Sequence, residues 1–162
     1  MSKNEKVIEL LSQNNLDALV VLSDYNRRYL SGFTGTSGAL VITPKENILI
    51  TDFRYIDQAT QQASDFEIVN RSAGLVEEVK TVLDKLNVKK AGFEGHIVSY
   101  DTFQLLNDSN VEYQSIGNAI EDIRAVKEQY EIDTIQKAAQ IVDETYEYIL
   151  TIAKALSLIH IS

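Results

Sequence analysis

The chain has 162 residues, is 44% hydrophobic and carries a formal net charge of −9 at pH 7, so it is long enough for one domain or one domain plus part of another. The negative charge should repel the phosphate backbone of nucleic acids, and the absence of cysteine excludes disulfides and thiolate sites. We find neither a signal peptide nor an apolar run near the ~18 residues of a membrane helix, so we expect a cytoplasmic protein that binds no membrane.

In chain order, the first 115 residues alternate between apolar β-prone runs and segments with helical spacing. The run 18–22 is continuous and apolar, which is typical of a strand buried on both faces. Two short strands, 38–42 and 48–51, are joined by a link too short for a parallel crossover, so they should be antiparallel. Strands are also expected at 67–70, 90–94 and 112–115, and helices at 7–11, 27–31, 55–63, 74–86 and 99–106. This alternation predicts an α/β fold with a mixed sheet and helices on both faces.

The sequence changes character after residue 120. A short amphipathic piece, 120–127, precedes a long helical pattern over 128–155, where apolar residues recur every three or four positions. Three arrangements remain open for this helix: it belongs to a further domain, it packs back on the sheet, or it pairs with another copy. The uncharged end, 156–162, is interpreted as a cloning or truncation scar.

The stretch Asn26–Gly38 holds three of the seven glycines of the chain, together with two arginines and two aromatic residues. Glycine lets a backbone or ligand approach closely, and the flanking strands would hold this loop as functional loops are usually held. A turn that only lets strands pack explains the glycines equally well. The doublet Arg27–Arg28 is interpreted as solvated surface.

No linear motif for catalysis is present. The chain has two histidines, His96 and His160, and lacks the spacing of a His-Glu-x-x-His zinc site, a nucleophile elbow or a phosphate-binding loop. A Ser-His-Asp triad would have to use His96, for which a structural role is favoured. A receiver-type signalling domain is disfavoured because Asp24 has no acidic neighbour.

Three blocks of this sequence resemble the N-terminal part of the aminopeptidase P, prolidase and creatinase family. The first is the loop Asn26–Gly38. The second is Leu49–Tyr55 followed by Gln58 and Ala59, with Phe53 where the family usually has glycine. The third runs from Ile123 to Ile141 and matches the linker and first helix of the family's catalytic domain.

The resemblance implies a creatinase/prolidase N-terminal fold, ribonuclease H-like, followed by one long helix. It predicts an N-terminal α/β domain at 1–125, then a linker and first helix of an otherwise absent pita-bread catalytic domain at 126–155. The parent enzyme would be a cytosolic Xaa-Pro dipeptidase or aminopeptidase that cleaves proline-containing peptides. Its two divalent metals, often manganese, would bind ligands beyond residue 155, so no catalytic or metal-binding residue is assigned to this chain.

In such enzymes the N-terminal domain covers the active-site mouth, often of a second subunit, and supports the dimer. By this resemblance, Asn26, Tyr29 and Phe33 would contact substrate or the partner's site. Arg54 and Tyr55 could serve there too, or could be internal scaffold with Arg54 paired to Asp52. The competing interpretation is a stand-alone binding or assembly module that associates through helix 128–155.

Overall fold

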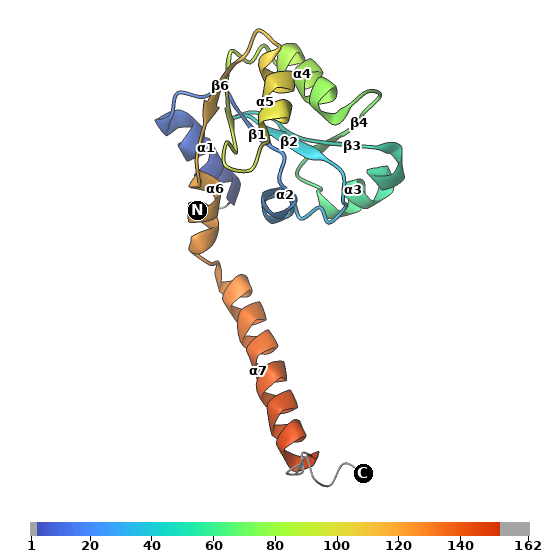
Figure 1. Cartoon of the computed structure of the whole chain (residues 1–162), viewed down its shortest axis with the longest axis vertical. Coiled ribbons are helices and arrows are strands. Elements are labelled where there is room, and N and C mark those ends of the chain that lie inside the picture. Colours follow the sequence, from blue (N-terminus) through green and yellow to red (C-terminus); the bar gives the residue numbers. More distant parts are fainter. Residues whose placement is uncertain (1–2, 153–162) are drawn as a thin grey trace, which may run out of the picture. The chain divides into compact units, whose positions relative to one another are not determined.

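The computed structural model describes residues 3–152. The chain divides into two units, Met1–Ala125 and Val126–Ser162. The first unit is an α/β domain built on a six-stranded mixed sheet with helices on both faces, as the sequence predicts (Figure 1). The segment 156–162, interpreted as a scar, lies outside the described residues.

The strands are ordered β4-β3-β2-β1-β5-β6 across the sheet. β2 is antiparallel to both of its neighbours, which confirms the predicted hairpin, while the remaining pairings are parallel. The carboxyl ends of the other five strands therefore meet at one edge of the sheet. The strands are β1 (Ala18–Val21), β2 (Ala39–Ile42), β3 (Asn47–Thr51), β4 (Glu67–Asn70), β5 (Lys90–Phe93) and β6 (Glu112–Ser115).

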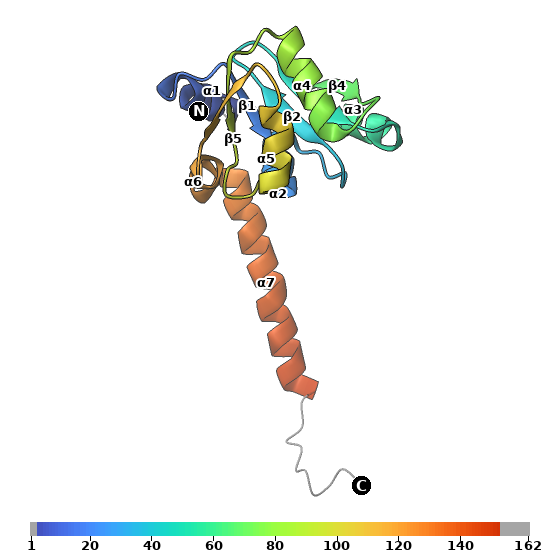
Figure 2. The same ribbon diagram turned by 45° about the horizontal axis from the view of Figure 1, so that its top comes forward.

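Helices cover both faces of this sheet because its central strands are apolar on both sides. In β1, Leu19 and Val21 pack into one core, and Ala18 and Val20 into the other. One core lies under α1, α2, α3 and α6, and the other lies under α4 and α5, which pack side by side (Figure 2). The helices are α1 (Lys3–Gln13), α2 (Asp24–Ser31), α3 (Ile56–Gln62), α4 (Leu75–Lys85), α5 (Tyr100–Asn107) and α6 (Ala119–Ala125).

Hydroxyl and carboxyl side chains set the starts of the helices nearest the carboxyl edge. Ser23 and Ser99 accept a hydrogen bond from the backbone N–H three residues later, which is the usual contact of a helix N-cap. The helix predicted over 55–63 instead begins with a 3₁₀ turn, η1 (Phe53–Tyr55), because the Asp52 side chain accepts the N–H of Arg54. That turn brings Arg54 to the carboxyl edge.

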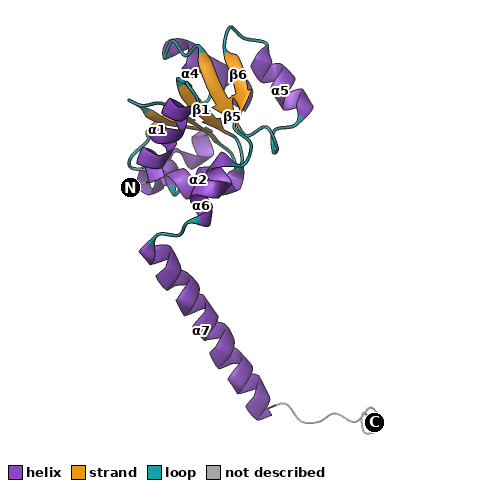
Figure 3. Cartoon of the chain, turned by 90° about the vertical axis from the view of Figure 1, so that its left-hand side faces the viewer, coloured by secondary structure: helices purple, strands orange, loops and turns teal. Residues whose placement is uncertain are grey.

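The described part of the second unit, residues 126–152, contains one continuous helix, α7 (Gln129–Ile152), within the helix predicted over 128–155 (Figure 3). None of its described side chains is buried. Within residues 3–152, no helix combines the length and apolar character that a membrane crossing requires.

Candidate functional site

Several polar side chains that interact within the first unit lie at the carboxyl edge of the sheet. Ser23 follows β1, Asp52 follows β3, Arg71 follows β4 and Glu94 follows β5. Ligands of open α/β sheets bind outside the carboxyl ends of the strands, beside a change in strand order. In this sheet, β2, β3 and β4 lie on one side of β1, and β5 and β6 lie on its other side, so the strand order changes direction at β1. The carboxyl edge beside β1 is therefore the candidate site.

Arg27 holds the glycine-rich loop that follows α2. Its guanidinium donates to the carbonyl oxygens of Gly35 and Gly38 at 2.6 and 2.8 Å and forms an ion pair with Asp24 at 2.8 Å. Arg27 is 2% exposed, so the expectation that it belongs to a solvated doublet is wrong. The loop carbonyls accept its hydrogen bonds in place of water, whereas Arg28 stays exposed.

Two glycines permit the path of this loop. Gly32 ends α2 at a φ of +76°, where its N–H bonds the carbonyl of Arg28. A Cβ on Gly38 would lie 2.8 Å from the carbonyl oxygen of Ile50 in the neighbouring strand. The glycines therefore serve both the turn and strand packing, and the loop that results is tightly held.

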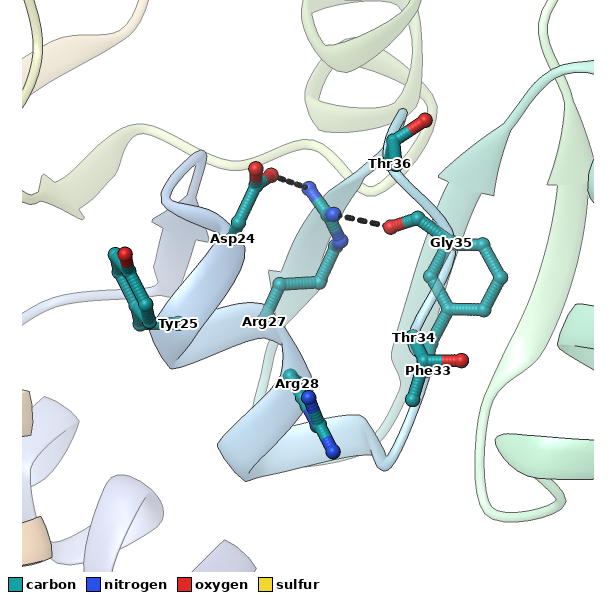
Figure 4. A pocket seen from close by; sticks show the side chains of 8 residues that line it. All are labelled: Asp24, Tyr25, Arg27, Arg28, Phe33, Thr34, Gly35 and Thr36. Atoms are coloured by element: carbon teal, nitrogen blue, oxygen red, sulfur yellow. Dashed lines mark hydrogen bonds and ion pairs between the residues drawn. The ribbon is translucent and has the colours of Figure 1, made fainter. Parts of the chain in front are cut away.

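The loop and the start of α2 enclose a shallow hollow of about 150 Å³ (Figure 4). Tyr25 projects away from the helix at its margin with 78% of its surface exposed. The exposed Thr34 and Thr36 form the opposite side, and the Arg27–Asp24 pair lies between. The hollow offers an aromatic ring, hydroxyls and a charged pair.

Behind this hollow, two aromatic rings in contact lie between two guanidinium groups. The Arg27 guanidinium lies 5.7 Å from the ring centre of Phe33, and the Phe33 ring meets that of Tyr55 edge-on at 6.0 Å. The Arg54 guanidinium lies 5.4 Å from the Tyr55 ring, whose hydroxyl is 2.7 Å from that of Thr36. Phe33 is fully buried and Tyr55 half-buried, so this row connects the core to the surface at Arg54.

Asp52 pairs with Arg54, as the scaffold interpretation predicts. The two carboxylate oxygens accept from Nε and Nη2 of Arg54 at 2.9 and 2.8 Å, and Nη2 of Arg71 lies 3.6 Å away. The hydrogen bond from Arg54 holds the pKa of Asp52 well below its usual range, and Asp52 in turn raises the pKa of Arg54. The Asp52 carboxylate thus forms two hydrogen bonds with the Arg54 side chain and a longer ion pair with Arg71.

Asn26 joins α2 to β5 and α6. Its amide nitrogen donates at 2.7 Å to both Glu94 and Glu121, and its amide oxygen accepts from Arg124 at 2.9 Å. Burial opposes the ionised form of Glu121, but the hydrogen bond from Asn26 and the nearby His96 outweigh it, so the pKa of Glu121 is lowered. Asn26 has no exposed surface and therefore fixes elements of the site from within.

Glu94 is fully buried at the end of β5 and also accepts from the N–H groups of Leu22 and Ser23 and from the Ser23 hydroxyl. It was not anticipated from the sequence, because its partners lie about seventy residues away. The only local signal was a carboxylate directly after a buried strand.

The residues predicted to line a substrate or partner surface divide into two groups. Asn26 and Phe33 have no exposed area, and Tyr29 is half-buried against the core with Lys3 over its ring at 4.1 Å. In this domain these three position the loop and α2. Arg54 and Tyr55 reach the surface. Across residues 3–152, no three His, Asp or Glu side chains converge in a geometry that could hold a metal ion.

Comparison with known proteins gives a consistent result. Residues 3–126 match the family model of the creatinase/prolidase N-terminal domain. An uncharacterized peptidase of Bacillus subtilis is 33% identical over 154 residues, covering 94% of this chain and 44% of the relative. The structure of an Xaa-Pro dipeptidase from Bacillus anthracis is 31% identical with a TM-score of 0.88, covering 94% of this chain and 43% of that one.

For the solved N-terminal domain of the cytoplasmic peptidase PepQ from Mycobacterium tuberculosis, the match covers nearly all of the solved domain. It is 31% identical with a TM-score of 0.69, and the match covers 74% of this chain and 96% of that domain. The chain therefore spans less than half the length of the Bacillus peptidases, whereas three quarters of it match nearly all of this isolated domain.

Proposed function

Because this chain belongs to the creatinase/prolidase N-terminal domain family, we propose that it is the non-catalytic N-terminal domain of an Xaa-Pro dipeptidase or aminopeptidase, inactive by itself. The parent enzyme is a cytoplasmic metallopeptidase that hydrolyses proline-containing peptides with two divalent metals, manganese being the expected ion. The described residues do not fit such a metal centre, since no three potential ligands converge. We therefore assign no step of the reaction to them.

The proposed role of the domain is to cover the mouth of the active site and exclude long peptides. The observation that carries this proposal is the loop at the carboxyl edge, which is rigidly tied by Arg27 while Tyr25 and Thr34 stay exposed. A steric barrier needs a fixed loop and an exposed surface but no titratable group. We propose that the parent enzyme is a dimer in which this edge faces the catalytic domain of the same subunit or of the second one.

The exposed apolar surface of α7 supports assignment of this helix to a catalytic domain. At about 100° per residue, its large apolar residues span about 200°, slightly more than half of the circumference. A two-stranded coiled coil needs a narrower seam, so a wide arc favours packing inside a larger domain over pairing with one copy. The large exposed apolar residues are Tyr130, Ile132, Ile135, Ile141, Val142, Tyr146, Tyr148, Ile149, Leu150 and Ile152.

Substitution of Tyr25 by alanine in the full-length protein tests the covering role. Tyr25 is exposed, so the fold should tolerate the change. We expect kcat/KM for Xaa-Pro peptides of four or more residues to rise several-fold relative to an Xaa-Pro dipeptide, because the loop leaves more room. Lys45→Ala, in the hairpin turn at the opposite edge, serves as the control. An unchanged length preference for Tyr25→Ala would refute the covering role of this surface.

A further inference from the structure

The carboxyl ends of β3 and β4 present two cations and a single anion. Asp52 and Arg71 follow these neighbouring parallel strands, whose last residues, Thr51 and Asn70, are paired in register. The N–H of Arg71 donates to the carbonyl of Thr51 at 2.8 Å, so the backbone fixes the two side chains beside each other. The cluster is therefore built by the sheet, not by a mobile surface loop.

The hydrogen bonds of the Asp52 carboxylate all come from Arg54, and Arg71 makes only a longer ion pair with it. One oxygen accepts from the N–H and Nε of Arg54, and the other accepts from Nη2 of Arg54 at 2.8 Å. Nη2 of Arg71 reaches the same oxygen only at 3.6 Å. In residues 3–152, no second carboxylate lies within 4.0 Å of either guanidinium.

Each of the two guanidinium groups keeps a nitrogen that makes no hydrogen bond to any described residue. Nη1 of Arg54 makes no hydrogen bond to any described residue, and the side chain is 60% exposed. The Arg71 side chain is 28% exposed, and its Nη1 donates to the carbonyl of Ala73. Its Nε is buried, so Nη2, which makes no hydrogen bond to any described residue, is the nitrogen left for a ligand. Two planar guanidinium groups with open donors match the geometry of a carboxylate.

Arg54 is also tied to the hollow at the glycine-rich loop. It stacks on Tyr55, and Tyr55 bonds Thr36 on the margin of that hollow. A molecule lying across the loop could therefore place an anionic end on Arg54. The acidic chain as a whole would repel such an anion, so a local pair of cations is what makes binding possible.

We propose that Arg54 and Arg71 form a carboxylate-binding site and, on the basis of the proposed function, that they bind the C-terminal carboxylate of a peptide substrate. Such a contact favours short peptides, whose carboxylate follows directly on the proline. It would direct the enzyme toward dipeptides. An acidic side chain from elsewhere in the protein has the same chemistry, and the experiment separates the two sources.

The first arm uses this chain without any activity measurement. ¹⁵N-labelled protein is titrated with Ala-Pro and with Ala-Pro amide at low and high salt. We expect amide shifts confined to residues 52–55 and 70–72 with Ala-Pro only, and their suppression by salt. Arg54→Gln should abolish these shifts, Arg54→Lys should weaken them, and Lys45→Gln, which removes one charge at the opposite edge, should preserve them. Equal shifts with the amide, or none with either peptide, would overturn the site.

The second arm uses the full-length enzyme. We expect Arg54→Gln to raise KM for Ala-Pro about tenfold with little change in kcat, and to leave KM for Ala-Pro amide unchanged. If Ala-Pro binds in the first arm but KM is unchanged here, the site does not bind the substrate carboxylate. Its natural ligand would then be an acidic side chain of the protein itself. If the full-length protein cleaves no Xaa-Pro peptide, the proposed function is wrong. The first arm still shows whether Arg54 and Arg71 bind a carboxylate.

Discussion

Glu94→Ala should lower the free energy of unfolding by about 3–5 kcal/mol, because four donors lose their acceptor inside the protein at about 1 kcal/mol or more each. The donors are the N–H groups of Leu22 and Ser23, the Ser23 hydroxyl and the Asn26 amide, at 2.6–3.0 Å. Since these groups start α2, the loss also loosens the loop that α2 carries. Urea unfolding followed by circular dichroism measures the change.

Two further variants make that result interpretable. Glu94→Gln keeps one acceptor oxygen and should cost less than Glu94→Ala. Glu112→Ala removes an exposed carboxylate from the edge strand β6, where it pairs with Lys90 at 3.5 Å, and should change stability by no more than about 0.5 kcal/mol. A cost for Glu94→Ala as small as that of Glu112→Ala would mean that the buried network does not hold the site.

Phe33→Ala should cost about 3–5 kcal/mol, the usual range for removing a buried phenylalanine. The ring is 0% exposed, and its atoms occupy the space beside Gly35 and against Tyr55. Its loss leaves a cavity under the glycine-rich loop, so the loop should also lose protection against amide hydrogen exchange. Both quantities are measured on the 162-residue chain.

Phe53→Ala is the matched control for this substitution. Phe53 lies in the neighbouring 3₁₀ turn but is 76% exposed, so its removal should change stability by no more than about 0.5 kcal/mol. Similar costs for the two phenylalanines would contradict the view that Phe33 supports the loop from below. The comparison separates a structural aromatic residue from an exposed one within the family signature.

The regular elements could be predicted because their signals are local. The strand at 18–22 follows from a continuous apolar run, and the hairpin follows from a short link. The parallel pairing of β1 with β5 could not be predicted, since no short link joins them and the pairing is formed only in the folded sheet.

The site was less predictable, because burial of its polar groups depends on partners distant in sequence. Arg27 was expected to be solvated because it is followed by a second arginine. In the structure it is buried, because the loop brings the carbonyl of Gly38 within hydrogen-bond distance of its guanidinium. Glu94 meets Ser23 across 71 residues. By contrast, the Arg54–Asp52 pair was predictable, because it joins residues two positions apart.

Peptide hydrolysis by this chain alone tests the central claim most directly. The 162-residue protein and its full-length natural form are incubated with Ala-Pro in the presence of Mn²⁺, and the released amino acids are quantified. We predict turnover by the full-length protein and none above the uncatalysed rate by the chain alone. Turnover by the chain itself, with a divalent ion bound to its own side chains, would contradict the account.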